Sequence, residues 1–296
     1  MIKDLVSVII PTYGGPEFLP RCIDSVLSQT YKKIEIIVVD DNGLNTPHQK
    51  ETAKMMEKYK HLQNVKYICH EVNRNGSAAR NTGVKASSGE YIAFLDDDDE
   101  YYPEFVENQI NLLCILPNDF ALSYTSFEQY SGNKLLSIFS AKKEGYLLYD
   151  VLIHSFEIPT SSMMIKRKVV EEFRGFDETF KRHQDWEFLV RIASKYKIKC
   201  NDCIGYKRHV VFRNSPKNTE QYKEYRIHWL SKMKPYINML DIKQQKNVYL
   251  LNRMDILLYF LKNREVKGFI KEWQDVQPGI FGVKYILRKI TAYITK

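Results

Sequence analysis

Short apolar runs alternate with stretches of helical periodicity in the N-terminal part of the chain, and this alternation restricts the folds available to it. Four of the runs have the length and β-branched composition of buried strands: residues 6–10, 34–39, 65–69 and 91–95. Helix-compatible stretches lie between them, at residues 18–27, 47–60 and 77–86, and another helix is expected to begin near Pro103. The order predicts an α/β fold with a mostly parallel sheet covered by helices on both faces.

Polar segments follow three of the predicted strands, at residues 11–15, 40–45 and 96–100. In open α/β sheets, ligands bind in a crevice beyond the carboxyl ends of the strands. We therefore expect these three loops to converge on one binding crevice.

The pattern changes in the second half of the chain. Short apolar runs at residues 120–124 and 162–165 and an expected helix at 186–196 make up a mixed segment. Long helical stretches then dominate, at residues 222–233, 247–263 and 282–294. We interpret residues 1–218 as one α/β domain and residues 219–296 as a helical appendage.

The acidic run Asp96-Asp-Asp-Asp-Glu100 follows the predicted strand at 91–95 directly. Adjacent carboxylates repel one another unless a cation or water offsets their charge. Carboxylate oxygens suit hard ions such as Mg²⁺ or Mn²⁺, which would also hold the phosphates of a nucleotide substrate. We favour a metal site over the alternative, an acidic surface turn, because the run lies at a strand end in the expected crevice.

No targeting or membrane-spanning segment is predicted. The N-terminal apolar run is broken by Ser7 and Pro11 and is too short for a signal peptide, and the most apolar stretch, at 256–261, is far shorter than the roughly 20 residues that span a bilayer. We expect a cytoplasmic protein whose five cysteines are reduced. The pair Cys200-x-x-Cys203 lacks the second pair of ligands that a zinc site requires.

The basic character of the chain belongs to its C-terminal part. Residues 219–296 contain 15 Lys or Arg and 7 Asp or Glu, which accounts for the whole net charge of +8. In a helix at 282–294, one face would be apolar (Val283, Ile286, Leu287, Ile290, Ile294) and the other polar and basic (Lys284, Arg288, Thr291, Thr295). Such a helix either rests on an anionic membrane surface, through residues 280–296, or packs against the protein's own core, and the charge excess favours the membrane.

Five segments in the first part of the chain together resemble the family 2 glycosyltransferases. They are residues 6–13 (VSVIIPTY), 29–31 (QTY), 35–41 (EIIVVDD), 76–83 (GSAARNTG) and 89–99 (GEYIAFLDDDD). Any one of them alone is a weak signal, but five in this order are specific. The resemblance is dense over residues 5–105 and continues to about 215.

The resemblance implies a fold of the GT-A type, in which a Rossmann-like nucleotide-binding half is joined to an acceptor half. On this basis residues 1–105 would bind a nucleotide-sugar donor and residues 106–218 an acceptor. It also implies a transfer reaction that inverts the anomeric centre and depends on a divalent metal.

Residue by residue, the resemblance assigns nucleotide-binding roles at the ends of the first strands. Pro11 and Tyr13 lie in the first loop, and Asp41 matches the aspartate that accepts hydrogen bonds from the nucleotide base, with Asp40 shaping the same loop. Arg80 lies in the segment that lines the donor site, where a guanidinium can stack on or donate to the nucleotide.

The acidic run supplies both nucleotide and metal contacts in this comparison. Asp96 and Asp97 are nucleotide-binding candidates, and Asp96 and Asp98 occupy the D-x-D positions that hold the metal, with Asp98 as the more direct ligand.

Asp185 matches the family's catalytic carboxylate at the start of a helix, with Gln184 before it. An inverting enzyme needs a carboxylate opposite the leaving diphosphate to remove the proton of the acceptor hydroxyl. As an alternative, Asp185 caps the helix. His209 falls near a family histidine that contacts the diphosphate, although a surface histidine is an equal interpretation.

These observations predict an inverting sugar transferase, a hexosyl- or N-acetylhexosaminyltransferase. Its donor would be a UDP-sugar and its acceptor a glycan or a lipid-linked glycan of cell-surface polysaccharide synthesis, met at the inner face of the membrane. A sugar-1-phosphate nucleotidyltransferase is an alternative, but residues 11–15 lack the Gly-rich phosphate loop expected of one. A nucleic-acid-binding protein, suggested by the pI of 9.0, is disfavoured because the charge is confined to the tail and no binding motif is present.

Overall fold

The computed structural model describes residues 1–210, 218–276, 279, 282–283 and 285–287. The chain divides into two compact units, which are Met1–Leu147 with Phe156–Val211, and Leu148–Ser155 with Phe212–Lys296. The segment Leu148–Ser155 therefore belongs to the second unit, whereas the sequence pattern placed it inside a continuous first domain.

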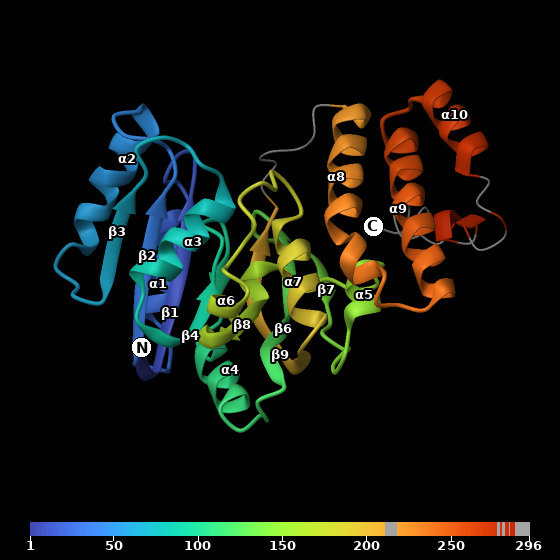
Figure 1. The fold of residues 1–296 in the computed structure, drawn as a ribbon. Helices are drawn as coiled ribbons and strands as arrows, with labels where there is room; N and C mark the ends of the chain where they lie inside the picture. The colour runs from blue at the N-terminus through green and yellow to red at the C-terminus, as the bar shows by residue number, and fades with distance from the viewer. Residues whose placement is uncertain (211–217, 277–278, 280–281, 284, 288–296) are drawn as a thin grey trace. The chain divides into compact units, whose positions relative to one another are not determined.

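A nine-stranded sheet organises the described part of the first unit (Figure 1). Its strands are β1 (Ile2–Thr12), β2 (Ile34–Asp40), β3 (Val65–Cys69), β4 (Gly89–Phe94), β5 (Glu100–Tyr101), β6 (Phe120–Ser131), β7 (Lys134–Phe139), β8 (Met163–Lys166) and β9 (Lys197–His209). Their order is β3-β2-β1-β4-β8-β6-β9-β5, and β7 pairs with β6. The strands β1 to β4 are parallel, as predicted, whereas β5, β7 and β8 pair antiparallel with their neighbours.

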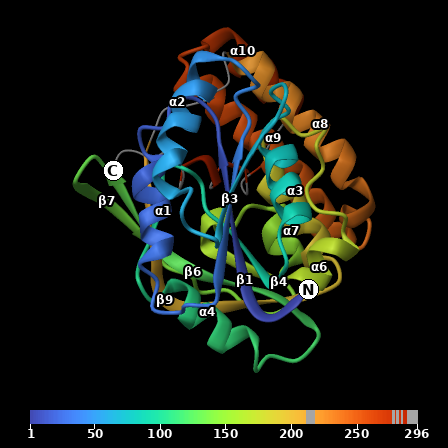
Figure 2. The same ribbon diagram turned by 90° about the vertical axis from the view of Figure 1, so that its left-hand side faces the viewer.

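Helices cover both faces of the parallel strands, which confirms the predicted α/β class. They are α1 (Leu19–Leu27), α2 (Pro47–Met56), α3 (Gly76–Ala86), α4 (Phe105–Leu113), α6 (Arg167–Glu172) and α7 (Gln184–Ala193). Figure 2 shows α1 and α3 on opposite sides of the sheet. Every residue of β2 is buried, and five of its seven residues are apolar, as expected of a strand covered on both faces. On the face of the sheet that α3 covers, Gly83 of α3 packs directly against Ile9 of β1. A Cβ at Gly83 would overlap the Ile9 side chain.

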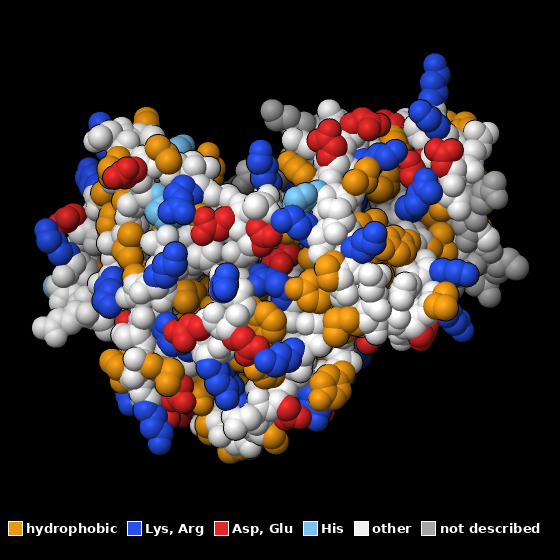
Figure 3. Space-filling view, in the orientation of Figure 1, with side chains coloured by type: hydrophobic (Ala, Val, Ile, Leu, Met, Phe, Trp, Pro, Cys, Tyr) orange, Lys and Arg blue, Asp and Glu red, His pale blue; other side chains and the backbone are white. Residues whose placement is uncertain are grey.

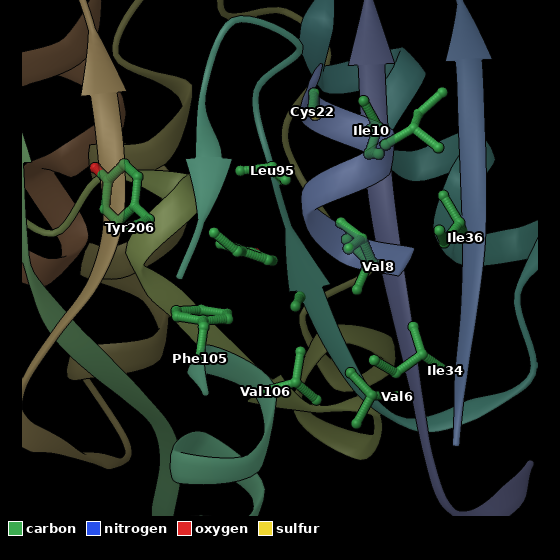
Figure 4. Close-up of a cluster of buried hydrophobic side chains, with 14 of the residues drawn as sticks. Val6, Val8, Ile10, Cys22, Ile34, Ile36, Leu95, Phe105, Val106 and Tyr206 are labelled. Atoms are coloured by element: carbon green, nitrogen blue, oxygen red, sulfur yellow. The ribbon is translucent and has the colours of Figure 1, made fainter. Parts of the chain in front are cut away.

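The main apolar core lies between the sheet and the helices α1 and α4 (Figure 4). Val8 and Ile10 of β1 point into it together with Ile36 of β2 and Cys22 of α1, and all four are fully buried. This packing holds the first two strands rigidly, so their carboxyl ends are fixed in position.

The second unit is helical in its described residues. It contains α5 (Leu148–Leu152), α8 (Thr219–Ile237), α9 (Ile242–Lys262) and α10 (Val266–Val276). Arg226 and Trp229 of α8 are fully buried, and Arg226 donates to Asp255 of α9 at 3.0 Å. No helix of the described residues is both long enough and apolar enough to cross a bilayer.

The predicted amphipathic helix at 282–294 falls largely outside the described residues. Within the described part, Ile286 is 6% exposed and packs with Met254 and Leu257 of α9. The Tyr285 hydroxyl donates to Asp255 at 2.7 Å. These two side chains therefore pack within their own unit, which was one of the two interpretations of this segment.

Basic and acidic side chains are interspersed on the face of the molecule shown in Figure 3. Several cations of the second unit are paired, among them Lys223 and Arg253, which both contact Glu272. Glu272 is one of the 7 acidic residues already counted, so these pairs leave the net excess of +8 unchanged.

Candidate functional site

Hydrogen bonds join the loops that follow β1, β2 and β4. The Thr12 hydroxyl at the end of β1 donates to Asp97 Oδ2 at 2.6 Å, and the Gly14 amide donates to Asn42 Oδ1 at 2.8 Å. The predicted convergence of these loops is therefore confirmed. Pro11 is half-buried at the strand end, and Tyr13 beside it is 50% exposed.

Asp40, the last residue of β2, and Asp41, the next residue, both accept hydrogen bonds from the protein's own groups. Asp40 accepts hydrogen bonds from the backbone and side chain of Asn42 and from the Tyr67 hydroxyl at 2.6 Å. Asp40 is fully buried, so it fixes the loop as expected.

Asp41 is 2% exposed and accepts two hydrogen bonds at each oxygen. Its donors are the His70 ring, the Asn73 side chain, and the backbone amides of Arg74 and Asn75, at 2.7 to 2.9 Å. A carboxylate has about four lone-pair sites, and all are used here. This arrangement makes Asp41 the anchor of the loop at 70–75, and its predicted hydrogen bond with a nucleotide base stays a prediction.

Arg80 of α3 links the acidic run to α7, the helix that carries the predicted base Asp185. One terminal nitrogen donates to Asp96 Oδ1 at 2.6 Å, and the other donates to Gln184 Oε1 at 3.2 Å. The guanidinium is 11% exposed and lies 5.6 Å from the centre of the Phe176 ring. Gly76 leaves room for this contact, since a Cβ at that position would lie 3.1 Å from Arg80 and 3.2 Å from Gln184 and would require these side chains to shift.

The four aspartates of the run divide into two pairs. Asp97 and Asp99 are buried, and Asp99 accepts from the Ser161 hydroxyl at 2.7 Å and from the His209 amide at 3.1 Å. Burial raises the pKa of Asp99 well above its usual value, and the neighbouring charges of Asp96 and Asp98 raise it further. Asp96 and Asp98 are the half-exposed pair.

A divalent cation is compatible with this donor set. Among the described residues, no three Asp, Glu, His or Cys side chains form a complete metal cluster. Mg²⁺, however, is usually held by one or two carboxylates together with water and substrate phosphates. Asp96 and Asp98 supply hard oxygen ligands of that kind, and they are the residues that would hold the ion.

Asp185 lies in the first turn of α7. The N-cap residue of this helix is His183, whose backbone is in the left-handed conformation. Burial raises the pKa of Asp185, and the Asp96 charge raises it further, while the Trp186 amide and the Arg80 charge oppose this. Asp185, Asp96 and Arg80 are therefore close enough to influence one another, and a carboxylate with a raised pKa is a stronger base.

His209, at the end of β9, adjoins the acidic run. Its ring contacts Glu100 Oε1 at 3.0 Å, and burial lowers its pKa. The structure thus brings His209 to the acidic run, where its side chain contacts Glu100, and its predicted contact with the diphosphate stays a prediction.

Three residues of this site were not identified from the sequence. Arg21 of α1 donates to the Asp98 carbonyl at 2.8 Å, Ser161 supports both Asp99 and the Asp96 amide, and Thr12 holds Asp97. Thr12 is part of the motif at 6–13 and could have been found there. Arg21 and Ser161 lie in segments whose relation to the acidic run depends on the tertiary fold.

Comparisons with known proteins identify the family to which the chain belongs. Residues 7–174 match the family described as glycosyl transferase family 2. The amylovoran biosynthesis glycosyltransferase AmsB of Erwinia amylovora is 28% identical over 256 residues, which cover 83% of each chain. WfgD of Escherichia coli, a UDP-Glc:alpha-D-GlcNAc-diphosphoundecaprenol beta-1,3-glucosyltransferase, is 27% identical over 225 residues, covering 76% of this chain and 84% of WfgD.

Among solved structures, S. aureus TarS in complex with UDP-GlcNAc superposes with a TM-score of 0.62 at 16% identity, covering 93% of this chain and 92% of that one. That similarity establishes a shared fold, of the predicted GT-A type. Because the family match spans more than half of the chain, the protein belongs to glycosyl transferase family 2 and is a glycosyltransferase.

Proposed function

We propose that the protein is an inverting, metal-dependent hexosyl- or N-acetylhexosaminyltransferase. Its donor would be a UDP-sugar, and its acceptor a glycan or a lipid-linked glycan of cell-surface polysaccharide synthesis. The names of AmsB and WfgD support the pathway and the type of acceptor, and the TarS complex supports the donor class.

The observation that carries the proposal is the placement of Arg80 between Asp96 and Gln184, the residue before Asp185. This arrangement supports a diphosphate site beside Asp96 and a catalytic base beside Gln184, on the two sides of the Arg80 guanidinium. An inverting transfer requires this separation of tasks, because the nucleophile and the leaving group lie on opposite faces of the anomeric carbon.

In the proposed reaction, the acceptor hydroxyl oxygen attacks the anomeric carbon while the bond from that carbon to the diphosphate oxygen breaks. The hydroxyl proton passes to the Asp185 carboxylate, and the nucleoside diphosphate leaves with the bonding electron pair. A divalent cation held by Asp96 and Asp98 would stabilise the charge of the leaving diphosphate as a Lewis acid. Arg80 would keep Asp96 oriented and contribute positive charge at the same edge.

The buried aspartates support these groups. Asp97 and Asp99 would position the backbone of the run, and Asp40 and Asp41 the loops beside it. His209, which contacts Glu100, would lie near the diphosphate.

A peripheral position at the inner face of the cell membrane is part of this proposal, because the acceptor named for WfgD carries a polyprenyl lipid. The segment at 280–296 was the predicted contact. Because Tyr285 and Ile286 pack within the second unit, the residues left for such a contact in that segment lie mostly outside the described part of the chain.

A panel of UDP-, GDP- and dTDP-sugars, each tested with Mn²⁺, Mg²⁺ and EDTA, would test the proposal. We expect metal-dependent release of UDP from one or two UDP-sugars, increased by a polyprenyl-diphosphate-linked acceptor. Equal turnover in EDTA would contradict the metal requirement. Release of pyrophosphate from UTP and a sugar 1-phosphate would instead indicate a nucleotidyltransferase.

A further inference from the structure

The strand β7 exposes three large apolar side chains at an edge of the sheet. Leu135, Leu136 and Ile138 are 43%, 49% and 52% exposed. β7 pairs with β6 along one edge, and no strand of the described residues pairs with its other edge. An exposed edge strand with apolar side chains and unpaired backbone groups tends to bind another molecule or surface.

Leu135 and Ile138 lie on one face of the strand, away from the core. Phe139 is paired with Phe127, and their rings stack at 4.6 Å against the main core. Ile138 is paired with Glu128 and Leu135 with Tyr130, two residues that share the other face of β6, because the register shifts by one residue at Leu136. The exposed apolar side chains of Leu135 and Ile138 can therefore enter one surface together.

The segment around β7 is basic. Residues 131–143 contain Lys134, Lys142 and Lys143 and no Asp or Glu. Lys134 and Lys142 are exposed and form no ion pair with any residue that the structure describes. The nearest acidic side chains along the chain are already engaged, Glu128 by two tyrosine hydroxyls and Glu144 by Lys199 at 2.7 Å.

We propose that the hairpin of β6 and β7 is a membrane-contact element. Leu135, Leu136 and Ile138 enter the interface of an anionic bilayer, and Lys134 and Lys142 bind its headgroups. The contact lies in the catalytic unit and is separate from residues 280–296. Its purpose, to meet a lipid-linked acceptor, rests on the proposed function, but the binding itself does not.

Vesicle co-sedimentation of the full chain without substrates tests the proposal. The vesicles would contain phosphatidylcholine with or without phosphatidylglycerol, at low and high salt. The test variant combines Leu135→Ser, Leu136→Ser and Ile138→Ser. The matched control combines Ile115→Ser, Met239→Ser and Ile242→Ser, at positions that are 77%, 60% and 73% exposed.

We expect the wild type and the control to bind phosphatidylglycerol vesicles equally, and the test variant to bind at least about tenfold more weakly. A second variant, Lys134→Glu with Lys142→Glu, should lose binding at low salt, where the charge attraction is strongest. UDP binding measured on the same samples should be unchanged, which separates a failure of this proposal from a failure of the proposed function.

Equal binding by the test variant and the control, or no binding by the wild type, would overturn the proposal. So would a dimer of the wild type that forms without lipid and is lost in the test variant, because the edge of β7 would then pair with a second copy of the chain.

Discussion

Arg80 donates to Asp96 at 2.6 Å, so that a cation from α3 is held against the first carboxylate of the acidic run. The same charge lowers the pKa of Asp185, which burial raises. Replacing Arg80 by Gln removes the lowering influence, so the pKa of Asp185 should rise further. A base is active when deprotonated, and the acidic limb of the kcat profile should therefore move to higher pH. Arg74→Gln, which removes a surface pair with Glu178, is the control and should leave the limb in place.

Asp185→Asn should retain donor binding and lose transfer by about 10²- to 10⁴-fold, because proton removal and donor binding are separate tasks. The measurements are UDP affinity by calorimetry and product formation by chromatography. In the wild type, we expect the acidic limb to lie above the ordinary aspartate pKa of about 3.9, since burial raises the pKa of Asp185. Near-normal turnover of a folded Asp185→Asn protein would leave Asp185 as a helix-terminal residue only.

Asp98→Ala should abolish the gain in UDP affinity that Mn²⁺ provides, since Asp98 is one of the two half-exposed carboxylates of the run. Calorimetry with and without metal measures this gain. The matched control is Asp202→Ala, an exposed aspartate in β9. An unchanged metal effect in Asp98→Ala would remove this residue from the set of metal ligands.

Asp41→Asn should destabilise the protein by about 1–3 kcal/mol, because an amide cannot accept all four of the hydrogen bonds that the buried carboxylate accepts. Urea unfolding followed by circular dichroism measures the free energy of unfolding. If Asp41 instead acts only by accepting a hydrogen bond from the nucleotide base, Asp41→Asn would leave the free energy of unfolding unchanged and would lower only the affinity for UDP.

Ile286→Ala should cost about 2–5 kcal/mol of unfolding free energy, as truncations of buried aliphatic side chains do. The neighbouring Leu287 is 58% exposed, so Leu287→Ala is the control and should be nearly neutral. The reverse order, with Leu287→Ala reducing vesicle binding and Ile286→Ala leaving stability unchanged, would favour the membrane interpretation of this segment.

The first half of the fold was predictable because its signals are local. The strands β1, β2 and β4 are mostly buried and contain short apolar runs, and the acidic run marks the end of β4. The loops at these strand ends could be located because ligand sites of parallel sheets lie at carboxyl ends.

The second half was not predictable in the same way. β9 is long, but its sequence contains Asn201, Asp202 and Gly205, and its pairing with β6 has irregular register. β9 is stabilised by pairing with β6, which is distant in the sequence, so the β-propensities of its residues alone did not predict the strand. The role of Asp41 was also hidden, because its donors belong to the loop at 70–75.

The insertion of Leu148–Ser155 into the second unit affects how this enzyme can be recombined with its relatives. The backbone passes between the two units at three points, after Leu147, after Ser155 and near Val211. A chimera that exchanges only the C-terminal helices would graft them onto an α5 from another parent, and the buried Val151 and Leu152 would then meet foreign neighbours. Exchanges of the second unit should therefore carry residues 148–155 along with the C-terminal helices.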